Sequence, residues 1–237
     1  MRIIFVRHGE PDYRRDCLTG TGVRQAEAAA ERLAGEGISA VYASPMGRAF
    51  QTACFTAERL KLPVHVLDFM HEITWGGPGL PENGHPWTLS EWLIDRDDFD
   101  FYAQDWRKHP FFAGNAAVDD LDRIAGAFDA FLLARGYRHE GRRFLCLREN
   151  RETLALFSHG GSGACVLSHL LALPFPYVCT VLPYDFTSVI ILDFPARPGE
   201  WVHPRVELFN DAAHIRGSSG PVFQQEADPL PSEDTPG

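Results

Sequence analysis

The chain has 237 residues, of which 45% are hydrophobic and 23% charged, so it can bury a substantial core. Its formal net charge of −10 provides no broad basic field, which argues against nucleic acid or an anionic membrane as a partner. It shows no cationic leader and no membrane-length apolar run, and we therefore expect a cytoplasmic protein.

The first third of the chain alternates between strand and helix patterns. The segment "RIIFV" at 2–6 is almost uniformly apolar, which is typical of a central strand covered on both faces. Helical spacing of apolar residues follows at 18–37 and 45–62, and further strand patterns lie at 38–44 and 63–68. This alternation predicts an α/β fold with a largely parallel sheet.

The character of the sequence changes over residues 74–118, where Gly, Pro and Asp are frequent. Four tryptophans gather there, namely Trp75, Trp87, Trp92 and Trp106. The interpretation we favour is that these aromatic side chains bury one another; the alternative is a cap segment inserted over an active site.

Regular patterns then return until the C-terminal tail. Helices are predicted at 119–137 and 162–173, and strands at 188–194, at 205–210 and on both sides of a polar turn at 149–151. The tail at 217–237 is rich in Pro, Ser and acidic residues and is predicted to be disordered. Residues 1–216 then form one domain.

Two predicted strands end in histidine followed by glycine. "IIFVRHG" ends at Arg7 and His8, and "LALFSHGG" ends at His159 and Gly160. Ligands of open α/β sheets bind beyond the carboxyl ends of the strands, so both histidines are candidate functional residues. Glycine lets the backbone turn sharply and approach a bound group, which makes Gly160 a candidate substrate-binding residue.

Two further side chains suit the chemistry of an anionic group. Arg48 lies at the predicted start of a helix, where free N–H groups and the guanidinium fork both favour phosphoryl oxygens. Glu72 follows the third predicted strand and is a candidate general acid, with His71 and Glu10 as competitors for that role.

Together these residue types indicate phosphoryl transfer on a small phosphorylated metabolite. A neutral imidazole would attack phosphorus, arginines would hold the nonbridging oxygens, and a carboxylic acid would protonate the leaving alkoxide.

An ordered set of motifs resembles the histidine phosphatase superfamily, the phosphoglycerate mutase-like group. The motifs are "VRHGE", "LTGTGVRQA", "YASPMGRAFQTA", "FSHGG" and "FNDAAHI". The resemblance implies a three-layer sandwich with a mixed, mainly parallel central sheet flanked by helices, and no metal or cofactor. It also implies roles for five residues: His8 as the phosphate-accepting nucleophile, Glu72 as proton donor, and Arg7, Arg48 and His159 as the phosphate pocket.

The sequence departs from the family pattern after the first motif. Pro11 stands where many members have Thr, and Arg14 stands where they have a phosphate-contacting Asn. Arg14 is therefore either a substrate contact or an exposed loop residue. The short segment after His8 and the unfamiliar 74–118 region favour a phosphatase; a mutase and an inactive phospho-ligand-binding relative are the alternatives. The sequence leaves the assembly state open, a homodimer included.

The remaining histidines show no HExxH or HxH spacing, so the sequence predicts no metal site. They are His65, His85, His109, His139, His169, His203 and His214, besides His71. The five cysteines form no CxxC pair, and we expect them to be reduced.

Overall fold

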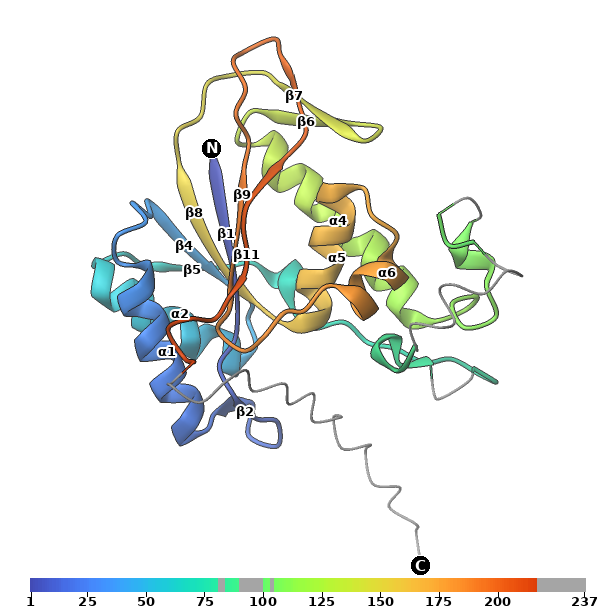
Figure 1. Ribbon diagram of the computed structural model, residues 1–237, viewed down its shortest axis with the longest axis horizontal. Helices are drawn as coiled ribbons and strands as arrows, with labels where there is room; N and C mark the ends of the chain where they lie inside the picture. Colours follow the sequence, from blue (N-terminus) through green and yellow to red (C-terminus); the bar gives the residue numbers. More distant parts are fainter. Residues whose placement is uncertain (81–83, 90–99, 103–104, 217–237) are drawn as a thin grey trace, which may run out of the picture.

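A computed structural model describes residues 1–80, 84–89, 100–102 and 105–216 of the chain. In these residues a six-stranded sheet lies between two layers of helices (Figure 1). The predicted α/β architecture is confirmed. The tail at 217–237, predicted to be disordered, lies outside the described residues, as do Trp92 and other parts of the 74–118 segment.

The strand order of the main sheet is β11-β9-β1-β8-β4-β5. The pairs β1–β8, β8–β4 and β4–β5 are parallel, whereas β9 is antiparallel to both β1 and β11, so the sheet is mixed and mainly parallel as predicted. The strands are β1 Arg2–Arg7, β4 Ala40–Ala43, β5 Val64–Val66, β8 Thr153–Ser158, β9 Val189–Asp193 and β11 Arg205–Asp211.

Helices cover both faces of the sheet, and this explains the nearly uniform hydrophobicity of β1. Ile4 and Val6 belong to the core cluster under α1 and α2, whereas Ile3 and Phe5 belong to the cluster under α4 and α5 (Figure 1). The helices are α1 Gly20–Leu33, α2 Gly47–Leu60, α4 Ala116–Leu133, α5 Gly160–Leu171 and α6 Phe175–Val181. No helix in the described ranges is long and apolar enough to cross a membrane.

A small antiparallel sheet, β10-β7-β6, lies beside the main one. Its strand β7 corresponds to the strand predicted before the polar turn at 149–151, but a second sheet was not predicted. The helix predicted over 119–137 ends earlier, at Leu133, because Gly136 adopts φ +92° and turns the chain into β6, which begins at Tyr137. The small strands are β6 Tyr137–Glu140, β7 Arg143–Cys146 and β10 Trp201–Val202, and a separate ribbon pairs β2 Pro11–Asp12 with β3 Cys17–Leu18.

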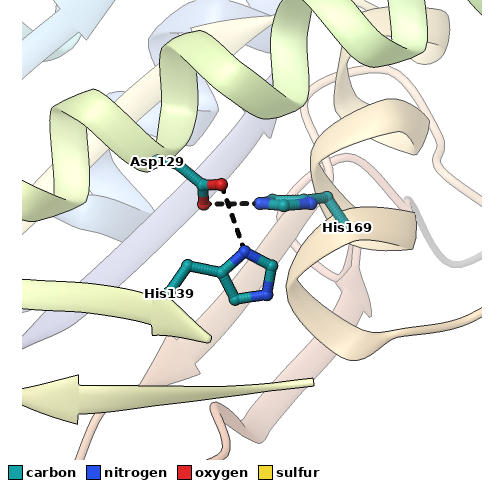
Figure 2. Close-up of side chains that lie close together, drawn as sticks. All are labelled: Asp129, His139 and His169. Carbon is teal, nitrogen blue, oxygen red and sulfur yellow. Dashed lines mark hydrogen bonds and ion pairs between the residues drawn. The ribbon is translucent and has the colours of Figure 1, made fainter. Parts of the chain in front are cut away.

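Three polar side chains lie together where β6 meets two helices (Figure 2). Asp129 of α4 accepts hydrogen bonds from His139 of β6 at 3.1 Å and from His169 of α5 at 2.7 Å. These two histidines are 30 positions apart in the sequence, so a search for closely spaced ligand motifs could not predict that they meet.

The described part of the 74–118 segment contributes aromatic side chains to the core. Trp75 and Trp87 lie with ring centroids 6.3 Å apart, and Trp106 contacts Phe112 at 5.1 Å and Phe175 of α6 at 6.0 Å. These contacts agree with mutual burial of the aromatic residues. The segment includes two short 3-10 helices, η3 Pro86–Thr88 and η4 Trp106–Lys108; another, η1 Asp68–Met70, precedes it.

Candidate active site

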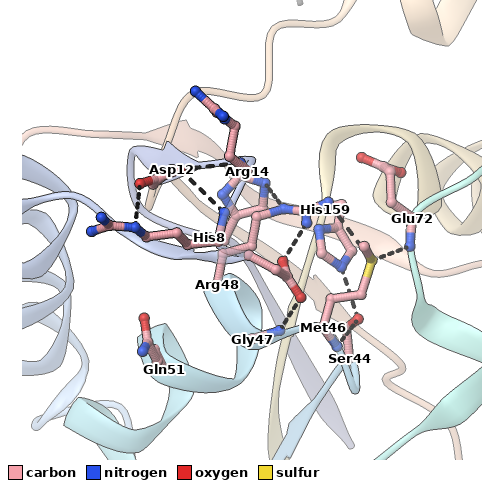
Figure 3. Close-up of polar contacts among 12 residues, drawn as sticks. His8, Asp12, Arg14, Ser44, Met46, Gly47, Arg48, Gln51, Glu72 and His159 are labelled. Atoms are coloured by element: carbon pink, nitrogen blue, oxygen red, sulfur yellow. Dashed lines mark hydrogen bonds and ion pairs between the residues drawn. The ribbon is translucent and has the colours of Figure 1, made fainter. Parts of the chain in front are cut away.

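The parallel pairing of β1 with β8 brings the two strand-end histidines together. Arg7 is in register with Ser158, so His8 and His159 both follow the carboxyl edge of the sheet. Their ring centroids lie 5.1 Å apart, and both residues are almost completely buried (Figure 3).

Two contacts on opposite sides of the His8 ring determine its tautomer. Nδ1 lies 2.7 Å from the carbonyl oxygen of Gly9, which can only accept a hydrogen bond. Nε2 lies 3.3 Å from Nε of Arg48, which can only donate one. The imidazole is therefore protonated at Nδ1, and the lone pair of Nε2 faces the guanidinium of Arg48.

The surroundings also keep His8 uncharged. Burial, followed by the positive charges of Arg7 and Arg48, holds the pKa of His8 well below its ordinary value, although the hydrogen bond to Gly9 opposes this effect. A neutral imidazole with a directed lone pair has the form that a nucleophile needs.

Arg48 is fixed by a carboxylate that the sequence reasoning missed. Asp16 accepts hydrogen bonds at 2.6 Å from Nη1 of Arg48 and from the backbone N–H of Gly47, at the start of α2. Asp16 has φ +49°, in the left-handed region that Asp tolerates better than most residues. Sequence position gave no signal for this contact, because Asp16 and Arg48 lie 32 residues apart.

Arg7 is held from one side and has an unpaired donor. Its Nη1 donates to the carbonyl oxygen of Tyr184 at 2.7 Å, and its guanidinium lies 4.3 Å from the ring centroid of Phe186. Its Nε is buried and makes no hydrogen bond within the described part of the chain. A buried unpaired donor is costly, so this N–H is suited to an anionic ligand.

His159 contacts the strand next to its own. Its Nε2 lies 2.8 Å from Oγ of Ser44, which follows β4. Burial lowers the pKa of His159 well below its ordinary value, and electrostatic interactions with His8, Arg48 and Arg7 act in the same direction. Two neutral imidazoles and two guanidinium groups therefore share the carboxyl edge.

Glu72 lies against the first turn of α5. Its carboxylate accepts backbone hydrogen bonds from Ile73 and Ser162 at 2.9 Å each and from Gly161 at 3.2 Å. Burial raises the pKa of Glu72, and these N–H donors and Arg7 only partly counteract it. A raised pKa is what a general acid requires near neutral pH.

Neither Gly9 nor Gly160, which follow the two histidines, has a positive φ that would favour glycine. The space available for a Cβ atom is therefore the property to compare. A Cβ on Gly9 would lie 2.6 Å from the carbonyl oxygen of Gly22, at the start of α1. A Cβ on Gly161 would lie 2.5 Å from Oε1 of Glu72. The backbone conformation therefore does not require glycine at 9 or 160, and close approach is the reason for glycine at 9.

The structure separates Arg14 and Glu10 from this cluster. Arg14 is exposed, its backbone N–H donates to Asp12, and its side chain extends away from His8 and His159 (Figure 3). Glu10 accepts a hydrogen bond from the Thr19 hydroxyl at the N-cap of α1. Of the other two predicted residues, Gly160 packs beside the Arg7 guanidinium, and His71 Nδ1 contacts the carbonyl oxygen of Glu72.

Comparison with known proteins agrees with this geometry. The sequence pattern of the histidine phosphatase superfamily, branch 1, matches residues 3–207. A probable phosphoglycerate mutase of Proteus mirabilis is 28% identical over 229 residues, covering 91% of this chain and 95% of that protein.

Two solved structures share the fold. A mycobacterial glucosyl-3-phosphoglycerate phosphatase with inorganic phosphate is 26% identical, with a TM-score of 0.59, and the match covers 91% of this chain and 99% of that one. An Entamoeba histolytica phosphoserine phosphatase with 3-phosphoglyceric acid is 21% identical, with a TM-score of 0.60 and the same coverage. Because the family pattern matches residues 3–207, the chain belongs to the histidine phosphatase superfamily.

Proposed function

We propose that the protein is a phosphatase that hydrolyses a small phosphomonoester through a phosphohistidine on His8. The observation that carries this proposal is the orientation of the His8 ring, whose Nδ1 is bound to Gly9 while Nε2 faces Arg48. A phosphoryl group placed at Nε2 would lie beside the Arg48 guanidinium, which would offset its charge.

In the first half-reaction Nε2 of His8 attacks phosphorus, a P–N bond forms and the ester P–O bond breaks. Arg7 and Arg48 hold the nonbridging oxygens, and Glu72 in its acid form gives its proton to the departing alkoxide, which leaves as an alcohol. In the second half-reaction water attacks phosphorus, the carboxylate of Glu72 takes a proton from it, and the P–N bond breaks to release inorganic phosphate.

The test is turnover of p-nitrophenyl phosphate and of a panel of phosphometabolites by the full chain in the presence of a chelator. We expect activity in the wild type and a loss of several orders of magnitude in His8→Ala, because that substitution removes the nucleophile. An inactive wild type, or a His8→Ala variant as active as the wild type, would overturn the proposal.

The covalent intermediate gives a second, independent readout. Brief reaction with a 32P-labelled substrate followed by an alkaline quench should leave label on the wild type, since phosphohistidine survives base and is lost in acid. His203→Gln, which changes an exposed histidine far from the cluster in sequence, should still be labelled, and His8→Ala should not.

A mutase is the second candidate, because the Proteus mirabilis relative carries that name and spans nearly the whole chain. The two activities differ in the acceptor of the phosphoryl group. A mutase returns it to bound substrate and should be activated by a bisphosphorylated primer, whereas the proposed phosphatase should release inorganic phosphate at the same rate without one.

A further inference from the structure

We propose that Asp129, His139 and His169 form a binding site for a divalent transition metal, with Zn²⁺ as the favoured ion. The three side chains come from α4, β6 and α5 and converge on one point (Figure 2). Within the described residues, this is the one group of three or more His, Cys, Asp or Glu side chains whose ligand atoms all lie within 4.8 Å of one another.

The distances suit a small ion after modest adjustment. In a tetrahedral zinc site with bonds of about 2.0–2.2 Å, neighbouring ligand atoms lie roughly 3.4 Å apart. Asp129 Oδ1 lies 2.7 Å from His169 Nε2, and Oδ2 lies 3.1 Å from His139 Nδ1. A metal ion bound between these atoms would leave the proton of each imidazole on its other ring nitrogen, and it requires side-chain movements on the order of an ångström.

The ligand set and its exposure match a three-ligand zinc site. Two imidazole nitrogens and one carboxylate oxygen are common zinc ligands, and three protein ligands leave a fourth position for water. The side chains of His169 and His139 are 13% and 19% exposed, and that of Asp129 is 33% exposed. The cluster is thus sheltered but open to an ion from solution.

The local field favours a cation. In the described part of the chain the ion pairs of Asp129 are with the two imidazoles and include no Arg or Lys. In addition, His169 lies in the last turn of α5, where the helix dipole places partial negative charge.

The ring of His139 is already supported on its other side. It stacks on Phe144 of β7, with centroids 4.7 Å apart and an interplanar angle of 24°, and it meets the ring of His169 edge to face at 4.6 Å. Such packing reduces the rotamer freedom that metal binding would otherwise remove.

This site is distinct from the candidate active site, but helix α5 connects the two. The first turn of α5 binds Glu72 and its last turn carries His169, and ten residues of helix span about 15 Å. A bound ion would join the ends of α4, α5 and β6, so we expect it to raise the thermal unfolding midpoint in proportion to the logarithm of its concentration once the site is saturated.

The experiment measures metal binding by the full chain after removal of adventitious metal with a chelator and dialysis. Zn²⁺ stoichiometry comes from equilibrium dialysis with elemental analysis, and affinity comes from Co²⁺ titration followed by visible absorption and competition with Zn²⁺. The variants are His139→Gln, His169→Gln and Asp129→Asn. His203→Gln controls for an exposed histidine, and His8→Ala controls for binding at the candidate active site.

We expect the wild type, His203→Gln and His8→Ala to bind one equivalent of Zn²⁺. The three cluster variants should lose this binding, with the affinity falling more than about 100-fold, since removing a direct ligand costs more than disturbing a residue that supports a ligand. The unfolding midpoint should rise with Zn²⁺ in the wild type and in His203→Gln, and should stay constant in His169→Gln. Equal metal binding by the wild type and His169→Gln, or no saturable binding by the wild type, would overturn the proposal and leave the cluster as a hydrogen-bonded clamp.

Loss of folding in a variant does not remove the test, because X-ray absorption at the zinc edge uses the wild type alone. One equivalent of zinc should show two imidazole ligands and additional oxygen ligands. The spectrum should be the same for His8→Ala, in which one of the two buried histidines of the candidate active site is missing. A spectrum without two imidazoles would contradict the assignment.

Discussion

Nε of Arg48 lies 3.3 Å from Nε2 of His8. Arginine donates and does not accept, so this contact places the imidazole lone pair toward the guanidinium, the group that best neutralises a phosphoryl oxygen. The same guanidinium is bound through Nη1 to Asp16, which fixes its plane before any ligand arrives.

Asp16→Asn should lower kcat/KM by about tenfold, because Arg48 loses the charged partner that orients its guanidinium. The amide retains the size of the carboxylate but weakens both the Arg48 contact and the bond from the N–H of Gly47. Steady-state kinetics with a phosphomonoester and binding of inorganic phosphate as an inhibitor provide the measurement.

Asp12→Asn is the matched control for Asp16→Asn. Asp12 is the last residue of β2, just before the turn that contains Asp16, and it accepts hydrogen bonds from the backbone N–H groups of Arg14 and Arg15, not from Arg48. We expect kcat/KM to change less than twofold in this variant. An equal loss in both variants would mean that the effect comes from the loop and not from the orientation of Arg48.

Glu72→Gln should slow hydrolysis of alkyl phosphates by about 10²–10⁴-fold, because the amide cannot protonate an alkoxide. The same variant should retain most of its kcat/KM for p-nitrophenyl phosphate, whose phenolate leaves without a proton, because kcat/KM reports the steps up to this departure and not the later hydrolysis of the phosphohistidine. Comparison of kcat/KM for the two substrates checks this. Equal losses on both would indicate that Glu72 acts through the packing of the first turn of α5 rather than by proton transfer.

Gly161→Ala should destabilise the protein by about 1–3 kcal/mol and displace Glu72. The added Cβ would lie 2.5 Å from both Oε1 of Glu72 and Cγ1 of Ile73, so the buried contact must open. Urea unfolding measures the free-energy change, and the ratio of alkyl to aryl phosphate turnover measures the effect on Glu72.

Gly126→Ala is the matched control for Gly161→Ala. Gly126 lies inside α4, is exposed, and has no atom within 4 Å of an added Cβ. Ala is favoured over Gly in a helix interior by about 1 kcal/mol, so this variant should be as stable as the wild type or more stable. If Gly161→Ala behaved in the same way, the close contact with Glu72 would not constrain this position.

The free energy of unfolding should decrease as pH falls below about 6.5. Burial lowers the pKa values of His8 and His159 in the folded protein, so the unfolded chain binds protons there that the folded protein does not. Each such group makes the free energy of unfolding fall by up to about 1.4 kcal/mol per pH unit between its ordinary and its lowered pKa. The raised pKa of Glu72 acts in the opposite direction.

Urea unfolding at several pH values between 7.0 and 5.5 separates these contributions. His8→Asn should reduce the pH slope of the free energy of unfolding by about one proton relative to the wild type, while the contribution of Glu72 is common to both. His203→Gln, which changes an exposed histidine, should leave the slope unaltered. An unchanged slope in His8→Asn would show that His8 takes up a proton equally in the folded and unfolded protein.

The local patterns in the sequence determined the strands of the main sheet and the helices that cover it, and with them the placement of His8 and His159. Both histidines follow strands that are apolar on both faces, and parallel neighbours end at the same edge of a sheet. Periodicity reports burial within one segment, which is why β1, α1, α2 and β8 could be predicted. It also failed locally, since α4 ends at Leu133 where Gly136 stops the helix.

Only the tertiary structure decided which distant residues meet. Three contacts join separate elements: Asp16 binds Arg48, Glu72 binds the first turn of α5, and the ring of His139 contacts that of His169. Each depends on how helices pack across the sheet and on glycines that allow close approach, and no spacing along the chain encodes these distances. Residue chemistry therefore indicated the kind of site, and packing determined its contacts.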